Sequence, residues 1–465
     1  MHWIDYTLIL SFLGGLVGYG IWQSRFNKTS ADYFLGGRNL PWPTAMFSIV
    51  ATETSVLTFI SVPGLAYRGD WFFLQLALGY ILGRILVSIF LLPQYFKTGI
   101  TSIYEVLGTK FGPEIQKTAS AVFLVTRILA DGIRYLATAV IVQVITGWSL
   151  PAAVLIIGGV TLVYSLLGGI RTIVWIDSLQ FILYLGGGLI TIGFILSHLN
   201  LSLIETVTLL GNEHKLDVFK FGGNVFKEPY TFISALIGGA FLSFASHGAD
   251  YMMVQRVLVT RNLSAGRKAM IGSGIFVFIQ FAVFLFAGSL IYLFLEGAEI
   301  SRDREFSTFI VNYLPVGLKG LLLAGVLSAA MSTLSSSVNS LASSTINDWM
   351  GTKATLKNSR IASFVWALVL IGIALIFDEG DTAIVVLGLQ IASFTYGGLL
   401  GLFILSRFNR VFKPLSLIAG LIASLLIVLY LKQAGLAWTW FIFFSVTGNI
   451  CIAYIFDKVR ELFSK

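Results

Sequence analysis

The sequence predicts an all-α polytopic membrane protein. Mean hydropathy is +0.86, and charged residues make up only 12% of the 465 residues, about half of the share that soluble domains carry. Apolar runs of roughly 20 residues, the length that crosses a bilayer as a helix, recur along the chain. No polar linker divides these runs, so a single transmembrane domain, residues 1–465, is expected. The single Cys451 excludes an intramolecular disulfide and a cysteine metal cluster.

The apolar runs predict about 13 transmembrane helices. They cover residues 4–23, 43–67, 70–96, 115–146, 150–168, 173–198, 230–255, 267–296, 316–349, 360–378, 382–406, 414–431 and 436–457. The first run lacks a basic region before it and a small-residue cleavage site after it. It is therefore expected to be a spanning helix and not a signal peptide.

The distribution of basic residues predicts how the chain lies in the membrane. With the N-terminus outside, the inner loops and the C-terminal segment hold 20 Lys and Arg residues and the outer loops hold 8. Inner loops carry such an excess in membrane proteins, so we expect the N-terminus outside and the C-terminus in the cytoplasm, in a plasma or inner membrane. The same bias explains the net charge of +8 without a nucleic-acid partner.

Two predicted spans are interrupted by polar residues at mid-membrane. The span 43–67 contains Thr52, Glu53 and Thr54, and the span 230–255 contains SHGAD at 246–250. Each span begins a block of five helices, 43–198 and 230–406, and an odd number of helices inverts the second block. Interrupted helices at corresponding places in two halves indicate a transport site at the membrane midplane. The helix 4–23 precedes these blocks, and the two helices in 414–457 follow them.

Residues 324–347 form an apolar segment that is unusually rich in hydroxyl groups. Ten Ser and Thr residues lie between positions 328 and 345. Ser332, Ser335 and Ser336 are at i, i+3 and i+4, so they share one face of a helix. Small and hydroxyl residues allow close helix packing in membranes, whereas a column of neutral oxygens suits a small hard cation. The segment alone leaves both interpretations open.

Six motifs in the same order resemble those of the sodium:solute symporters. They are DYFLGGRNLPWP (32–43), ATETSVLTF (51–59), ITSIYEVLGTKFG (100–112), YSLLGGIRTIVWIDSLQ (164–180), VQRVLVTRN (254–262) and LSAAMSTLSSSVNSLAS (327–343). The resemblance covers nearly the whole chain. It implies a LeuT-like five-plus-five inverted repeat and Na⁺-coupled secondary active import of a small organic solute by alternating access, and it does not imply an enzyme.

The resemblance also implies residues for each site. The first sodium site would use carbonyl and hydroxyl oxygens of Ala51, Thr54, Ala329, Ser332 and Thr333. The second sodium site would use Asp177, Ser332, Ser335 and Ser336. Solute would contact Ser55 and Thr58, and the same cavity would be lined by Gln75, His247, Asp250 and Tyr251. Na⁺ is the only cofactor expected.

Charged residues within the predicted spans suggest a supporting network and the charge of the solute. They are Glu53, Arg84, Arg127, Asp131 and Arg134, and intramembrane charges are a functional hypothesis by default. The arginines favour an organic anion or a zwitterion. A proton-coupled or sodium-independent transporter of the same fold and a sugar or polyol symporter remain alternatives. A channel would need a continuous polar path, and a hydrolase would need a nucleophile with its base. The sequence predicts neither.

Overall fold

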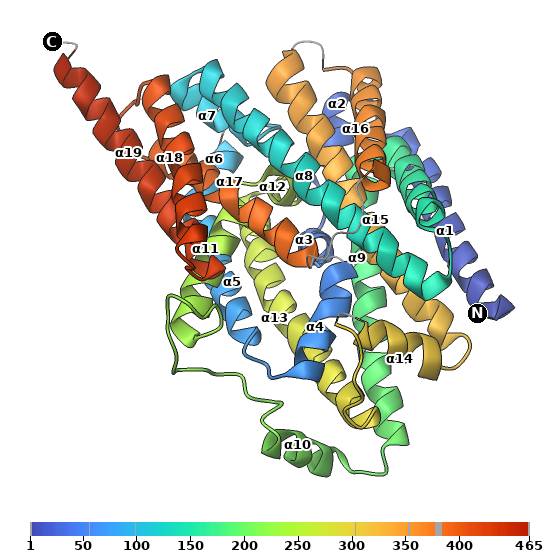
Figure 1. Ribbon diagram of the computed structural model, residues 1–465. Coiled ribbons are helices and arrows are strands. Elements are labelled where there is room, and N and C mark those ends of the chain that lie inside the picture. Colours follow the sequence, from blue (N-terminus) through green and yellow to red (C-terminus); the bar gives the residue numbers. More distant parts are fainter. Residues whose placement is uncertain are drawn as a thin grey trace.

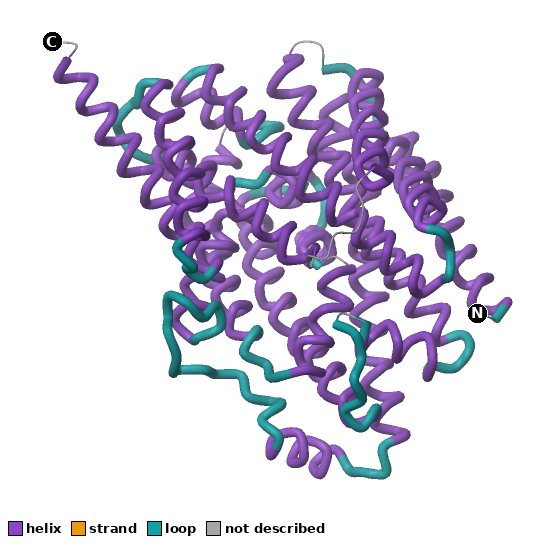
Figure 2. The backbone as a smooth tube through the Cα atoms, viewed as in Figure 1, coloured by secondary structure: helices purple, strands orange, loops and turns teal. Residues whose placement is uncertain are grey.

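The computed structural model is a bundle of helices (Figure 1). It describes residues 2–463 except 55, 98, 303, 352–353 and 377–383, and it describes only the backbone of 57, 145 and 384–393. No β-strand occurs in the described part of the chain, where one isolated bridge pairs Leu40 with Thr260. Figure 2 shows the same bundle with its loops. The all-α prediction is confirmed.

The helices follow the predicted segments closely. Those of the first half are α1 (Trp3–Gln23), α2 (Ser30–Leu35), α3 (Trp42–Glu53), α4 (Val56–Arg68), α5 (Leu74–Leu86), α6 (Leu92–Lys97), α7 (Tyr104–Phe111), α8 (Pro113–Thr146) and α9 (Leu150–His198). Those of the second half are α10 (Leu203–Asn212), α11 (Phe232–Gly248), α12 (Tyr251–Leu258), α13 (Leu263–Phe294), α14 (Glu305–Tyr313), α15 (Leu318–Ser344), α16 (Leu356–Ile376), α17 (Ile384–Ser406), α18 (Pro414–Gln433) and α19 (Phe441–Phe463). The short elements are η1 (Ser24–Phe26), η2 (Gly36–Arg38), η3 (Val87–Leu91), η4 (Thr345–Met350) and η6 (Trp438–Trp440).

The structure supports many membrane crossings but does not test the predicted number of 13. Among the described residues, eight helices are long and apolar enough to span a membrane, or up to ten if each bent pair counts as one span. Helix α9 has 49 residues, about 74 Å at 1.5 Å per residue, which is far longer than one bilayer crossing of about 30 Å. Gly169 interrupts it with φ 61° and ψ −165°, as the two predicted spans 150–168 and 173–198 require. The count of about 13 stays a prediction.

Both predicted broken helices are present. The pair α3 and α4 is bent by 64°, and the pair α11 and α12 is bent by the same angle. At the second break the Asp250 side chain accepts a hydrogen bond from the backbone N–H of Met252 at 2.9 Å and so caps α12. Each break places the C-terminal end of one helix inside the bundle. The assignment of residues 43–198 and 230–406 to two repeats stays a prediction.

Glycines join α5 to α11 through their backbones. A Cβ atom on Gly79 would lie 2.4 Å from the carbonyl oxygen of Leu236, and one on Gly83 would lie 2.3 Å from that of Ala240. No side chain fits at such distances, so these positions require glycine. Small residues allow this close approach in membrane helices, where van der Waals packing drives association. We call this contact the glycine seam.

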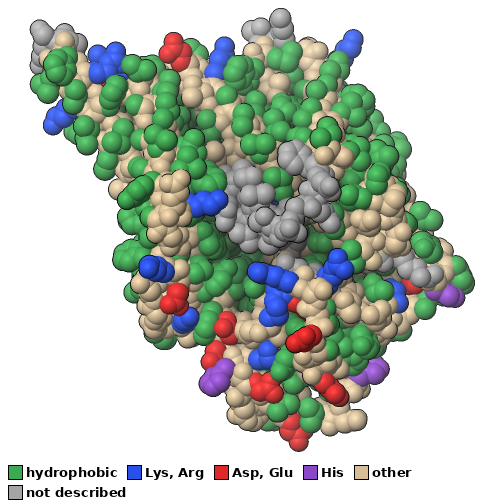
Figure 3. Space-filling model, in the orientation of Figure 1, with side chains coloured by type: hydrophobic (Ala, Val, Ile, Leu, Met, Phe, Trp, Pro, Cys, Tyr) green, Lys and Arg blue, Asp and Glu red, His purple; other side chains and the backbone are tan. Residues whose placement is uncertain are grey.

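Helix α15 lies at the centre of the bundle. In its most apolar 18-residue stretch 94% of the residues are buried, whereas the corresponding value is 28% for α1 and for α18. Its hydroxyl residues therefore face other helices and not lipid, and α9, α8, α1 and α3 pack around it. Apolar side chains and uncharged atoms cover much of the face seen in Figure 3, and the charged side chains lie along its upper edge and in its lower half. This pattern fits a multi-pass membrane protein.

Candidate functional site

The carboxylate of Asp177, fully buried in α9, joins three helices. Ser332 of α15 donates a hydrogen bond to its Oδ1 at 2.8 Å, and Ser48 of α3 donates to its Oδ2 at 2.7 Å. The Thr52 hydroxyl, one turn after Ser48, donates to the Ser48 carbonyl oxygen at 2.8 Å and lies 3.3 Å from the same Oδ2 and 3.4 Å from the Ser336 hydroxyl. Four hydroxyl oxygens from α3 and α15 therefore gather around one carboxylate.

Arg256 completes this cluster. Its guanidinium lies 3.3 Å from Asp177 Oδ2, donates to the Ser336 hydroxyl and donates to the carbonyl oxygen of Met252 at 2.7 Å. The predicted span 230–255 ends before Arg256 and leaves this residue in the loop that follows. That placement is wrong, because α12 continues to Leu258 and buries Arg256 completely. The residues predicted for the second sodium site are thus brought together with a cationic side chain on them. Ser335 instead donates to the Ser332 carbonyl oxygen at 3.1 Å.

The residues predicted for the first sodium site lie on two helices that pack together, α3 and α15. Ala51, Thr54, Ala329, Ser332 and Thr333 are all at most 6% exposed. Helix α3 ends at Glu53, so Ala51 belongs to the last turn, whose carbonyl groups a helix leaves without internal donors and whose partial charge is negative. The Thr333 hydroxyl lies 3.5 Å from the Ala329 carbonyl oxygen. Neutral oxygens at a negative helix end fit a small hard cation.

A second charge cluster lies at the break between α3 and α4. Arg84 of α5 forms an ion pair with Glu53 and donates to Ser273 of α13 at 2.7 Å. His247 of α11 has its Nε2 3.6 Å from the same Glu53 carboxylate, and this nitrogen finds no hydrogen-bond partner among the described residues. The Glu53 side chain is 17% exposed. A partly exposed acid and an unpartnered imidazole nitrogen therefore lie side by side at the break.

A third cluster surrounds Arg127 of α8. Its guanidinium bonds to Asp131 at 3.0 Å, to Asp250 at the second break and to the Tyr396 hydroxyl of α17 at 2.6 Å. Arg134 lies 3.6 Å from Asp131 with its side chain 17% exposed. The predicted charge network is thus two clusters, one around Arg84 and one around Arg127. Asp250, predicted to line the solute cavity, is bound within the second of them.

The residues predicted to contact solute do not all meet. Thr58 is half-buried on α4, and Ser55 lies outside the described residues. The Gln75 amide donates to the Tyr230 carbonyl oxygen at 3.0 Å and accepts from the backbone N–H of Lys220 at 3.2 Å. Its contacts therefore anchor the long loop after α10.

Tyr251 also has partners away from the first break. Its hydroxyl donates to the Thr101 carbonyl oxygen and lies 2.7 Å from the Ser343 hydroxyl. Ser343 is three turns further along α15 than Ser332. The structure therefore brings His247, but not Tyr251, close to Glu53.

Several residues of the three clusters were not predicted. They are Ser48, Thr52, Arg256, Ser273, Ser337 and Tyr396. The spacing of Ser48 and Thr52, one turn apart on α3, is a signal that sequence analysis could have used. Arg256 carries a weaker signal, because it follows the second break by only six residues.

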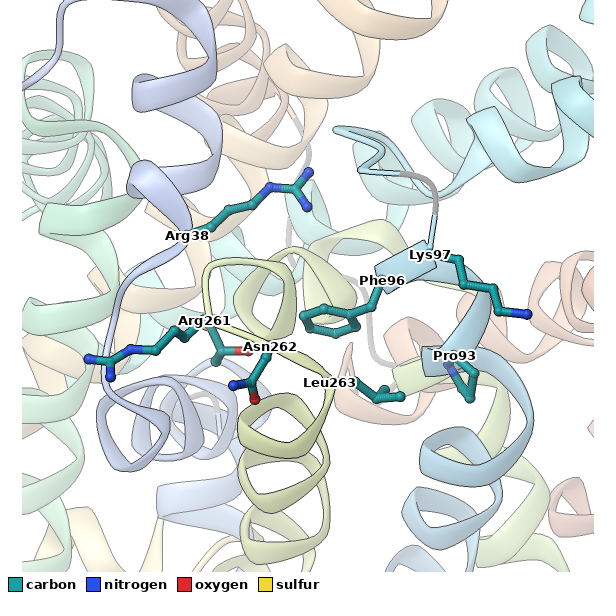
Figure 4. A pocket seen from close by; sticks show the side chains of 8 residues that line it. Arg38, Pro93, Phe96, Lys97, Arg261, Asn262 and Leu263 are labelled. Carbon is teal, nitrogen blue, oxygen red and sulfur yellow. The ribbon is translucent and has the colours of Figure 1, made fainter.

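A cavity of about 400 Å³ lies elsewhere, at the start of α13. Figure 4 shows Arg38, Lys97 and Arg261 at its wall, with side chains that do not converge on one point. The cavity contains no residue predicted for the solute or sodium sites. We therefore place the candidate functional site at the two breaks and α15.

Known proteins resemble this chain over most of its length. The sequence model of the sodium:solute symporter family matches residues 33–423. The sodium/sialic acid symporter NanT of Aliivibrio fischeri is 26% identical, over 97% of this chain and 92% of that protein. The human sodium/iodide cotransporter is 27% identical, over 92% of this chain and 69% of that protein.

A solved structure agrees with these relatives. A Na⁺-coupled sialic acid symporter, solved in a substrate-bound outward-open state that revealed a novel Na⁺-site, has a TM-score of 0.88 and 25% identity and covers 98% of each chain. A nucleobase-cation-symport-1 family transporter has a TM-score of 0.60 at 15% identity, over 90% of this chain and 92% of that one, and shares the fold alone. The protein is a multi-pass membrane transporter, not an enzyme, that couples an organic solute to Na⁺. The chain belongs to the sodium:solute symporter family.

Proposed function

We propose that the chain imports a small organic anion or zwitterion together with Na⁺ by alternating access. The observation that carries this proposal is the line of buried hydroxyl groups on α15 facing the interrupted end of α3. Such oxygens belong in a membrane core only if other groups satisfy them. A bound cation and the Asp177 carboxylate provide that satisfaction.

The first sodium ion binds, in this proposal, between the carbonyl groups of Ala51, Thr54 and Ala329 and the hydroxyl groups of Ser332 and Thr333. It joins the broken end of α3 to α15. An ion that binds one conformation better shifts the equilibrium toward that conformation by its differential affinity. Sodium thereby fixes α3 and α4 in the arrangement that receives solute. The membrane potential adds about 2.3 kcal/mol per charge per 100 mV.

The solute charge is inferred from the groups at the breaks. Glu53 and Arg134 are the two partly exposed charges of the described intramembrane clusters, and they have opposite signs. An ammonium group would pair with Glu53, and a carboxylate would pair with Arg134. Relatives named for sialic acid, iodide and monocarboxylate act on anions. His247, beside Glu53, would hydrogen-bond the solute through its unpartnered nitrogen.

The orientation in this proposal has the N-terminus outside and the C-terminus in the cytoplasm. Moving Arg256 from the inner loops to the core leaves the basic bias intact. The N and C labels lie on opposite sides of the bundle in Figure 1. A membrane-impermeant thiol reagent on intact cells should label a cysteine placed at Asn224 and not one placed at Lys357.

A thermal-shift screen of the purified protein tests the function. Unfolding is followed in sodium and in potassium buffer, with organic acids, amino acids, sugars and vitamins as probes. A ligand that binds only the folded state raises the unfolding temperature. We expect an acid or an amino acid to do so only in sodium. Equal stabilisation in potassium would favour the proton-coupled or sodium-independent alternative, and stabilisation by polyols alone would favour a sugar symporter.

Two double variants on α15 make the test specific. Ser332→Ala with Thr333→Ala removes both hydroxyl ligands of the proposed first site and should abolish the effect of sodium. Ser328→Ala with Ser340→Ala removes two buried hydroxyls of the same helix that bond only to α15 carbonyl oxygens, and it should retain the effect. Sodium dependence that survives in the first variant would refute the assigned site.

A further inference from the structure

Arg256 and a second sodium ion would need the same oxygens. The guanidinium touches Asp177 and Ser336, and both residues belong to the predicted second sodium site. A carboxylate with hydroxyl groups around it attracts any cation, whether tethered or free. An ion that binds Asp177 Oδ2 and the Ser336 hydroxyl must displace the guanidinium from these oxygens, and repulsion between the two like charges favours that displacement.

We propose that the guanidinium of Arg256 and a second sodium ion compete for the oxygens around Asp177, so that the second ion binds only when Arg256 withdraws. The proposal rests on the proposed function, since it adds a second ion to the same transport cycle. Arg256 is an internal substitute for that ion. It keeps Asp177 neutralised whenever the ion has left, which prevents an unpaired buried carboxylate.

The surroundings of the two groups make this exchange feasible. Asp177 accepts hydrogen bonds from Ser48 and Ser332 that do not involve Arg256. Arg256 is carried by α12, which has only eight residues and begins at a helix break. A change of the Arg256 side-chain rotamer would withdraw the guanidinium, whereas the α12 backbone stays tied to α15 through Tyr251–Ser343 and Gln255–Asn339. Its Nε atom has no hydrogen-bond partner among the described residues, so this contact is incomplete in the arrangement seen.

Competition lowers the apparent affinity for the second ion. The apparent dissociation constant equals the intrinsic one divided by the fraction of molecules with Arg256 withdrawn. If that fraction is about a tenth or less, removing the guanidinium tightens the second site about tenfold or more. The first site does not touch Arg256 and should keep its affinity.

Equilibrium binding of radioactive ²²Na⁺ to the purified full-length protein measures both sites. We expect wild type to bind one ion tightly and a second ion weakly. Arg256→Gln should bind two, the second at least about tenfold more tightly than wild type. Asp177→Asn with Arg256→Gln, which removes both buried charges together, should bind one. Arg267→Gln, which removes an exposed arginine bonded to the Ser88 carbonyl oxygen of η3, should bind as wild type does.

An unchanged isotherm in Arg256→Gln, or a wild type that fills two sites with equal affinity, would overturn the competition. A wild type that binds no sodium would instead refute the proposed function. The two failures are therefore distinguishable.

Hydrogen exchange of the wild type tests the same point without a substitution that could prevent folding. Saturating sodium, compared with potassium, should protect α3 and α15 and should accelerate exchange in residues 251–258 of α12, because Arg256 has been released. Protection of α12, or no change there, contradicts the proposal. Absence of protection in α3 and α15 contradicts the first sodium site.

Discussion

Two buried arginine clusters are held by the two ends of α12, and they differ in what surrounds the guanidinium. At the start of α12, Asp250 binds Arg127, which also binds Asp131 and the Tyr396 hydroxyl. At the end of α12, Arg256 binds a single carboxylate and a hydroxyl group. The Arg127 cluster is saturated by carboxylates, whereas the Arg256 cluster consists mainly of neutral oxygens.

This difference indicates that the ion pairs of Arg127 are permanent, whereas the contact of Arg256 with Asp177 can be exchanged for another cation. Removing Arg127 takes away the cation that two buried carboxylates share and leaves uncompensated charge. Removing the guanidinium from Asp177 leaves a carboxylate that still accepts hydrogen bonds from Ser48 and Ser332. We therefore infer that the first cluster joins α8, α12 and α17 throughout the cycle and that the second one opens.

The largest expected effect is that of Arg127→Gln. It leaves Asp131 and Asp250 without their shared partner, and breaking a buried pair in this way costs about 3–5 kcal/mol. The thermal unfolding midpoint of the purified protein should fall strongly in sodium and in potassium alike. Arg134→Gln is the matched control, because Arg134 is partly exposed and 3.6 Å from Asp131. Its unfolding midpoint should fall much less. Equal midpoints for the two variants would remove the distinction.

Arg256→Gln should have a smaller effect that depends on the salt. In potassium we expect a loss of about 1–3 kcal/mol, the range for a buried polar group that loses a partner. In sodium much of this loss should be recovered, because an ion bound to the folded state stabilises it by mass action. Unfolding midpoints in the two salts measure this difference. Recovery of Arg127→Gln by sodium to the same extent would show that both clusters exchange their cation.

Thr52→Val should have a lesser effect still. It removes the hydroxyl that lies 2.8 Å from the Ser48 carbonyl oxygen and 3.3 Å from Asp177, and one hydrogen bond is worth about 0.5–1.5 kcal/mol. Thr172→Val, at a buried threonine of α9 whose hydroxyl finds no partner in the described structure, is the matched control and should lose nothing. If both threonines behaved alike, the hydroxyl groups around Asp177 would be ordinary packing residues.

Lys220→Ala, outside the membrane, should have the smallest effect. Lys220 and Glu228 form an ion pair of 2.7 Å with side chains 38% and 41% exposed, and exposed pairs contribute little. The Lys220 hydrogen bond lowers the pKa of Glu228 below its ordinary value of 4.5. The pair therefore stabilises above that pKa and is lost as pH falls through the lowered value. Midpoints of variant and wild type should differ slightly at pH 7 and coincide at pH 3; a large difference at pH 3 would contradict this.

Much of the fold could be predicted from the sequence, because each signal was local. Apolar runs predicted the helices, and the polar residues around Glu53 and Asp250 predicted the two breaks. The hydroxyl residues of α15 predicted a helix that faces other helices or a cation, because a lipid-facing helix consists mainly of apolar side chains. Each of these inferences needed only one stretch of the chain.

The position of Arg256 could not be predicted, because it depends on a bend in the chain that its own sequence segment does not show. Arg256 seemed to follow the end of a span, and only the 64° bend before α12 returns it to the core. Gln75 and Tyr251 stay predictions as solute residues. In the structure Gln75 bonds to the loop after α10, and Tyr251 bonds to the Thr101 carbonyl oxygen and lies beside Ser343 of α15, which are contacts between distant segments that the sequence does not show.

The glycine seam has a consequence for anyone who wishes to follow this transporter in motion. Helices α5 and α11 touch through backbone atoms at Gly79 and Gly83, so neither can slide or rotate against the other without a steric clash. A pair of spectroscopic labels placed across the seam should therefore report one constant separation in every state. That pair gives an internal reference distance, against which labels on α12 and α8 can be read.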